Sequence, residues 1–119
     1  MLEEVPYSAV AKHSRAAAKD HVSVSDTKRT TWYRTPRHEG FCALLEVGRD
    51  AVRIKGVYVH PEWRGRGIGS AMTDELLRKA ASGPYKVIEV LAYNPAFYES
   101  RGFTRKNQLR NGAWRLVKQ

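Results

Sequence analysis

The stretch VYVHPEWRGRGIGSAM, residues 57–72, joins an alternating apolar run to an amphipathic run through a segment rich in glycine and arginine. The first run predicts a strand that ends near Val59, and apolar residues spaced four apart from Ile68 onward predict a helix. The first N–H groups of a helix have no partners within it, so this helix start can bind an anion. Glycines let the backbone approach the anion closely, and Arg64 and Arg66 add positive charge. The stretch therefore predicts a phosphate-binding loop.

Two familiar phosphate-binding motifs are excluded by the residues of this loop. A dinucleotide fingerprint that begins at Gly65 needs glycine or alanine at the position of Ser70. A P-loop needs a Gly-Lys-Ser or Gly-Lys-Thr triplet, and the chain contains neither. From the glycines alone, a tight turn without a ligand stays open as the alternative.

The hydrophobic pattern on both sides of the loop predicts a single domain over residues 1–119. Its fold class is α/β (α+β), with a mixed, mostly antiparallel sheet flanked by helices, because a hairpin precedes the loop and a helix then crosses back to the next strand. The expected elements are a helix over residues 7–20, strands over 30–34, 41–47 and 51–59, a helix from 68 to the stop at 82–84, a strand over 86–92, a helical turn over 95–100 and a last strand over 113–118.

Length and composition predict a small cytoplasmic protein. The 119 residues leave room for one domain, and no apolar run reaches the roughly 20 residues of a membrane span. The first residues lack the basic and apolar pattern of a secretory signal. The single cysteine, Cys42, lies in an apolar run and has no partner for an internal disulfide, and no cluster has metal-ligand spacing. We therefore expect no metal site.

The net charge of +9 narrows the choice of partners without settling it. Residues 101–119 contain six Lys or Arg and no acid, and a second basic cluster lies within residues 28–37. Such charge suits a nucleic acid, a phosphorylated cofactor or a solvated basic surface.

A second motif further along the chain gives the glycine loop a more specific meaning. Arg64, Gly67 and Gly69 match the pattern Arg/Gln-x-x-Gly-x-Gly/Ala, and YESRGF at 98–103 matches Tyr-Glu-x-x-Gly-Phe. In this order, separated by a helix and a strand, the two motifs resemble those of the GCN5-related N-acetyltransferases. The resemblance covers about residues 40–106 and implies acetyl-CoA as acyl donor and an amine as acceptor.

The resemblance also implies roles for the matching residues. The hydroxyl group of Tyr98 would protonate the leaving CoA thiolate. The backbone of Val57, Tyr58 and Val59 would hold the pantetheine arm. The residues that would hold the pyrophosphate are Arg64, Gly65, Arg66, Gly67, Ile68, Gly69 and Ser70.

The chain departs from the family pattern in three places. Residues 1–29 are a short N-terminal region, so the acceptor wall is expected to be reduced or supplied by a partner. The asparagine that is common eight residues before the tyrosine is replaced by Val90, which leaves Asn94 as the candidate cofactor contact. Many members carry a glutamate base in the strand before the loop, but residues 53–55 contain no carboxylate. The candidate bases are Glu46, which we predict to be catalytic, His60 and His38.

The charged residues of the strand before the loop indicate the chemical class of the acceptor. In strict alternation, Arg53 and Lys55 share a face with Val57 and Val59 and point toward the acceptor. Two cations there favour an anionic acceptor. The predicted function is direct transfer of an acetyl group to a primary amine on such a molecule. The alternative is a protein of the same fold that modifies or binds nucleic acid, and open sheet edges allow a homodimer.

Overall fold

The computed structural model describes all residues from Met1 to Gln119. The elements in chain order are β1 (Glu3–Val5), α1 (Ser8–Ala11), α2 (Ser14–Ala18), β2 (Thr30–Arg34), β3 (Gly40–Val47), β4 (Ala51–Val59), the 3₁₀ turn η1 (Pro61–Trp63), α3 (Ile68–Ala81), β5 (Val87–Ala92), α4 (Pro95–Glu99), β6 (Thr104–Gln108) and β7 (Trp114–Lys118). Seven strands form one sheet in the order β1-β2-β3-β4-β5-β7-β6, and only β4 and β5 pair in parallel. The predicted mixed, mostly antiparallel sheet is confirmed.

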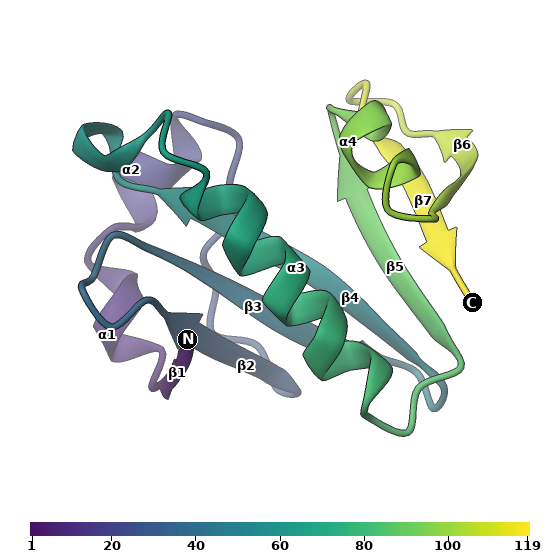
Figure 1. The fold of residues 1–119 in the computed structure, drawn as a ribbon, viewed down its shortest axis with the longest axis horizontal. Coiled ribbons are helices and arrows are strands. Elements are labelled where there is room, and N and C mark those ends of the chain that lie inside the picture. The colour runs from purple at the N-terminus through teal and green to yellow at the C-terminus, as the bar shows by residue number, and fades with distance from the viewer.

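Helix α3 is the crossover between the two parallel strands, as the sequence predicts. It leaves the glycine loop after β4, runs back across the sheet and returns the chain to β5 (Figure 1). Its apolar residues Met72, Leu76 and Ala80 are buried, with exposed fractions of 2% or less. These side chains, spaced four residues apart, therefore form the apolar stripe of the helix that packs on the sheet.

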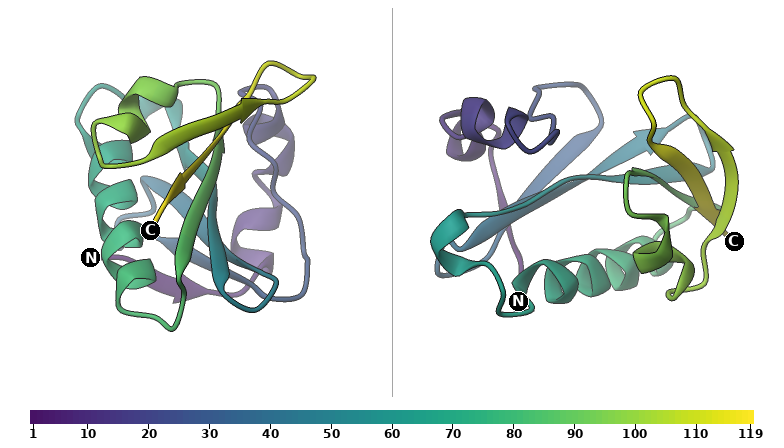
Figure 2. Two further views of the ribbon diagram at one scale, coloured as in Figure 1. Left: turned by 90° about the vertical axis from the view of Figure 1, so that its right-hand side faces the viewer. Right: turned by 90° about the horizontal axis from the view of Figure 1, so that it is seen from above.

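The sheet lies between two helical layers (Figure 2). Helices α3 and α4 cover one face, over the main core, which includes Leu76 and Leu116. Helices α1 and α2 cover the other face, where Trp32, Phe41 and Tyr58 form a smaller core. None of the helices combines the length and apolar character that crossing a membrane requires.

A β-bulge interrupts β4 in the middle. On β3, Phe41 and Ala43 are two positions apart, whereas their partners on β4, Tyr58 and Lys55, are three positions apart. The extra residue falls at Gly56, whose φ of +65° is a left-handed conformation that glycine adopts without steric cost. The bulge thus inserts one residue into the alternation of the strand.

The bulge reverses which face of the sheet the later residues of β4 occupy. Ile54 before it and Val57 and Val59 after it all contact the core under α3. Lys55 lies on the opposite face, where its Nζ is 5.9 Å from the ring centroid of Trp32. The prediction that Arg53 and Lys55 share a face with the two valines is therefore wrong, because strict alternation ends at the bulge.

The sequence pattern misses two edge strands and one helix break. Strand β1 has three residues, and every residue of β6 is exposed, so neither carries an apolar alternation. The helix predicted over residues 7–20 is divided into α1 and α2.

Candidate functional site

Strands β4 and β5 separate beyond their last paired residues, Ile54 and Val90 (Figure 1). A cleft of about 820 Å³ occupies the opening between them. One part of the cleft is lined by α3, α4 and the glycine loop, and another by residues 20–23, which follow α2. The edge of β4 that faces β5 has no strand partner from Lys55 onward. The splayed strands thus leave a passage whose wall includes free backbone groups.

The glycine loop of residues 64–70 lies where α3 begins. Gly67 is the N-cap residue of α3 with a φ of +78°, and an added Cβ there would meet no atom within 4 Å. The first backbone hydrogen bond of the helix runs from the Ala71 N–H to the Gly67 carbonyl at 3.0 Å. The N–H groups of residues 68–70 therefore have no backbone acceptor. Open space beside free donors at a helix N-terminus fits a pyrophosphate group.

The two arginines of the loop contact protein groups. Arg64 donates from Nε to the Val59 carbonyl at 2.8 Å and from Nη2 to Oδ2 of Asp20 at 2.6 Å. Arg66 stacks over the ring of Trp63 at 5.0 Å and does not line the cleft. In this structure Arg64 ties the end of β4 to the segment after α2.

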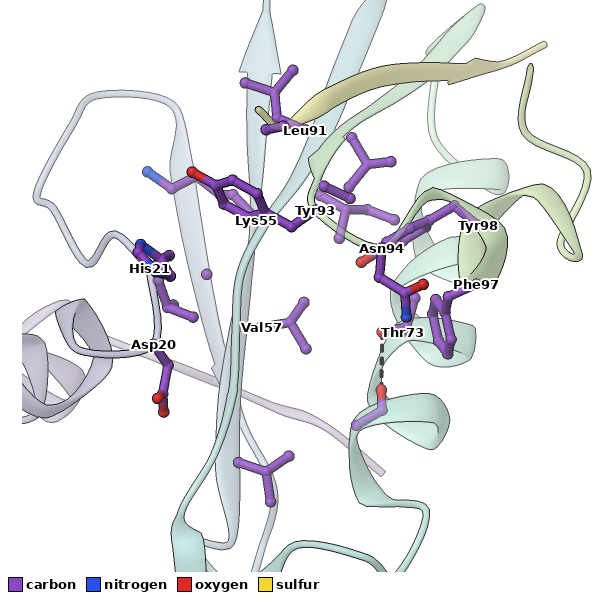
Figure 3. A pocket seen from close by; sticks show the side chains of 18 of the residues that line it. Asp20, His21, Lys55, Val57, Thr73, Leu91, Tyr93, Asn94, Phe97 and Tyr98 are labelled. Atoms are coloured by element: carbon purple, nitrogen blue, oxygen red, sulfur yellow. Dashed lines mark hydrogen bonds between the residues drawn. The ribbon is translucent and has the colours of Figure 1, made fainter. Parts of the chain in front are cut away.

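Tyr98 lines the cleft from α4, on the side opposite Lys55 and His21 (Figure 3). Burial raises the pKa of Tyr98, and this effect outweighs the lowering by the Arg101 guanidinium. The phenol is therefore protonated at neutral pH and is able to donate a proton. Its ring packs edge-on against the buried Phe103 at 5.6 Å.

The remaining residues of the YESRGF motif fix α4 in place. Arg101 donates from Nε to Oδ1 of Asp74 on α3 at 2.7 Å and from Nη1 to the Phe97 carbonyl at 3.0 Å. Glu99 forms an ion pair with Arg105 at 2.7 Å, which links α4 to β6. The motif therefore holds the tyrosine of α4 against α3 at the cleft.

Most of the predicted cofactor residues come together at this cleft. Asn94 lines it at the start of α4. Tyr58 does not, because its side chain is buried in the smaller core and only its backbone follows the free edge of β4. The other predicted residues that line the cleft are Val57, Val59, Arg64, Gly65, Gly67, Ile68, Gly69 and Ser70.

The three candidate bases named from the sequence lie outside the cleft. Glu46 accepts a hydrogen bond from the Tyr85 hydroxyl at 2.8 Å, near the β3–β4 hairpin. His60 packs edge-on against His13 at 4.6 Å, in the layer of α1 and α2. His38 is exposed in the turn before β3. None of them reaches the splayed strands, so the structure gives Glu46 no part in this site.

The acceptor side of the cleft contains residues that sequence reasoning missed. His21 and Tyr93 pack their rings 5.4 Å apart, and both line the cleft (Figure 3). Leu91, which is 38% exposed, lines the same cleft. His21 belongs to a polar, turn-like segment without periodicity, so the sequence pattern does not identify it as a site residue. In the structure it is distinguished by a left-handed backbone, with a φ of +61°.

The two cations predicted for the acceptor side differ in how they are paired. Arg53 donates to Oε1 of Glu89 at 2.6 Å, and Glu89 also accepts from Arg115 at 2.9 Å. Lys55 has no carboxylate partner, and its Nζ donates to Ser25 Oγ at 3.2 Å. Burial, followed by the charge of Arg53, lowers the pKa of Lys55. Lys55 is thus the cation available to a ligand on this side.

A family model described as "Acetyltransferase (GNAT) domain" matches residues 12–105. No match is found among curated proteins. Solved structures of similar fold include Escherichia coli ElaA, at 15% identity and a TM-score of 0.78, with 100% of this chain and 99% of that chain covered.

Two further solved structures of similar fold contain CoA. Rv2747 from Mycobacterium tuberculosis, in complex with CoA and NLQ, is 17% identical with a TM-score of 0.76, over 99% of this chain and 98% of that chain. N-acetylglutamate synthase from Neisseria gonorrhoeae, with CoA and L-arginine, is 15% identical with a TM-score of 0.74, over 100% of this chain and 32% of that chain. At these identities the likeness establishes the fold.

Proposed function

The chain belongs to the GNAT family of acetyl-CoA-dependent acetyltransferases, and on this premise we propose that it transfers the acetyl group directly to a primary amine that carries an anionic group. The observation that carries the proposal is the cleft between β4 and β5. On one side it has free N–H groups and a protonated tyrosine, and on the other a lysine without a carboxylate partner. Donor and acceptor would enter from these two sides and meet between the strands.

The donor side supplies binding groups and a proton. Bound acetyl-CoA supplies the activated acetyl group as a thioester. The N–H groups of residues 68–70 would hold its pyrophosphate, and the free edge of β4 over residues 57–59 would hydrogen-bond the pantetheine amides. Tyr98, which its raised pKa keeps protonated, would donate its proton to the departing thiolate. Asn94, at the start of α4, would contact the same arm.

The acceptor side favours a carboxylate or phosphate next to the amine. Lys55 would pair with that anion, because Arg53 already forms an ion pair with Glu89 and Lys55 has no carboxylate partner. Leu91 and the ring of Tyr93 would contact apolar parts of the acceptor. A purely cationic polyamine would be repelled.

The nucleic-acid alternative receives less support from the surface charges. Of the six cations in residues 101–119, Arg101, Arg105 and Arg115 form ion pairs with carboxylates of other elements. Trp114 packs against the main core and carries Arg105 on its ring. Nucleic-acid binding, a homodimer and a cytoplasmic location stay predictions.

Thermal unfolding with and without acetyl-CoA tests donor binding. A ligand present at 100 times its Kd stabilises the folded state by about 2.7 kcal/mol, which raises the Tm by several degrees. An unchanged Tm at millimolar acetyl-CoA would contradict the proposal.

Thiol release from acetyl-CoA then tests transfer. L-phenylalanine and 2-phenylethylamine are suitable probes, because they differ only by the carboxylate. We expect the first to be acetylated with the higher kcat/KM and Tyr98→Phe to lower kcat. Tyr85→Phe is the matched control, since Tyr85 lies outside the cleft. Equal rates for Tyr98→Phe and the wild type would remove the tyrosine from the mechanism.

A further inference from the structure

His21 lies at the acceptor side of the cleft, on the segment after α2 (Figure 3). Its imidazole packs on the Tyr93 ring with 5.4 Å between centroids and 49° between planes. We propose that His21 is the base that removes the proton from the acceptor amine, an inference that rests on the proposed acetyl transfer. The sequence candidates Glu46, His60 and His38 lie elsewhere.

Elimination among the ionisable groups that line the cleft leads to this residue. Asp20 is bound to Arg64 at 2.6 Å and Arg53 to Glu89, so neither is free. Phenol side chains are ordinarily protonated at neutral pH, and Lys55 is assigned to pair with the anionic group of the acceptor. Imidazole is the one side chain that ordinarily changes its charge between about pH 5 and 8. The ionisable residues lining the cleft are Asp20, His21, Arg53, Lys55, Arg64, Tyr93 and Tyr98.

The backbone at His21 is fixed by local hydrogen bonds, whereas its exposed side chain contacts the ring of Tyr93. The N–H of His21 donates to the Ala18 carbonyl, and the N–H of Val22 donates to the Ala17 carbonyl, each at 3.0 Å. The neighbouring Asp20 is anchored to the glycine loop by its ion pair. His21 itself has a φ of +61°, a conformation that non-glycine residues seldom adopt. Strain of this kind persists where the surrounding structure imposes it.

The chemistry requires one base and one acid. The acceptor arrives as an ammonium ion, and His21 takes one proton so that the nitrogen lone pair can attack the thioester carbonyl. As the C–N bond forms, the C–S bond breaks and sulfur takes the phenol proton of Tyr98. The nitrogen loses its second proton, which restores the phenol, and His21 releases the first proton to solvent. The products are an amide, a CoA thiol and one proton.

The test compares His21→Asn with His38→Asn. Asparagine tolerates a left-handed backbone, and His38 has the same type of φ, +59°, in a turn outside the cleft. Thiol release is measured from pH 5 to 9 with acetyl-CoA and L-phenylalanine, L-glutamate or 2-phenylethylamine. We expect His21→Asn to lower kcat/KM by about 10²- to 10⁴-fold and to remove the limb that rises with pH, whereas His38→Asn follows the wild type.

Other charged groups face the same space, so they need their own controls. Asp20 and Arg64 approach from the side of His21, Arg53 and Lys55 from β4, and Tyr93 from the end of β5. Lys55→Met should keep the rising limb of the pH profile. In His21→Gly, which accepts the left-handed φ, added imidazole should restore part of the activity.

A binding measurement separates the possible failures. In proton NMR spectra, the C2–H signal of the His21 imidazole is identified as the one that is missing from His21→Asn. In the wild type this signal should move when L-phenylalanine or L-glutamate is added, and the C2–H signal of His38 should not. An active wild type with an unaltered pH profile in His21→Asn would overturn the role of His21. So would loss of the acetyl-CoA-induced rise in Tm, because the residue would then be structural. A wild type that neither binds acetyl-CoA nor releases thiol would instead overturn the proposed function.

Discussion

The bulge in β4 gives the most quantitative test of how this sequence builds its cleft. The perturbation is Gly56→Ala, which adds one methyl group where the φ is +65°. That methyl carbon would lie 2.7 Å from two ring carbons of Trp32, whose exposed fraction is 2%. A buried ring has little room to move, so the added atom strains both the backbone and the smaller core.

The expected cost has two parts. A left-handed conformation costs an alanine about 1–2 kcal/mol, and overpacking a buried site costs about 1–3 kcal/mol. We therefore expect Gly56→Ala to lower the free energy of unfolding by about 2–5 kcal/mol. Gly48→Ala is the matched control, because Gly48 has a φ of +66° and no atom within 4 Å of the added carbon. It should lose only the first part, about 1–2 kcal/mol.

Urea denaturation of the two variants and the wild type measures both values by linear extrapolation. The difference between the variants isolates the overlap with Trp32. Equal losses would refute the reasoning, because they would mean that the ring yields without cost. If Gly56→Ala stays folded, a reduced rise in Tm with acetyl-CoA is also expected, since the bulge sets the free edge of β4.

Three further predictions follow from the site and the core. Lys55→Met should raise the KM for L-phenylalanine at least tenfold and leave that for 2-phenylethylamine within twofold, as measured by thiol release. Cys42 should not react with Ellman's reagent until the chain unfolds, because it is fully buried and burial raises its pKa to about 12; rapid reaction of the native protein would contradict its placement. Burial, followed by the charge of His60, lowers the pKa of His13 below its ordinary 6.5, so the unfolded chain binds protons more readily. Stability should therefore fall as the pH drops below 6.5, and His13→Gln should weaken this dependence in urea midpoints measured from pH 7 to 5.

The fold was predictable wherever a side-chain pattern reflects burial. The four-residue stripe of α3 and the apolar runs of β3, β4 and β5 all face a core, so their periods identify them. Strand β6 has no buried residue and β1 is very short, so neither produces such a period. The bulge at Gly56 was not predicted because one glycine within a strand pattern fits several backbone conformations, and the sequence does not show that the buried Trp32 ring leaves no room for a Cβ there.

The donor side of the cleft is formed mainly by one continuous stretch of chain, which comprises β4, the glycine loop and the start of α3. The spacing of residues in the sequence therefore predicts how they are arranged in the site. The acceptor side is assembled from segments far apart in sequence, including His21, Lys55 and Tyr93. No spacing relates these residues, and the bulge moves Lys55 away from the valines with which alternation grouped it. The sequence therefore predicts a general base by residue type alone, and it favours Glu46, which lies on β3 next to β4 but outside the cleft. In this fold a sequence motif forms the donor site, whereas contacts between distant segments form the acceptor site. The pH profile of His21→Asn tests whether one of those distant residues acts as the base.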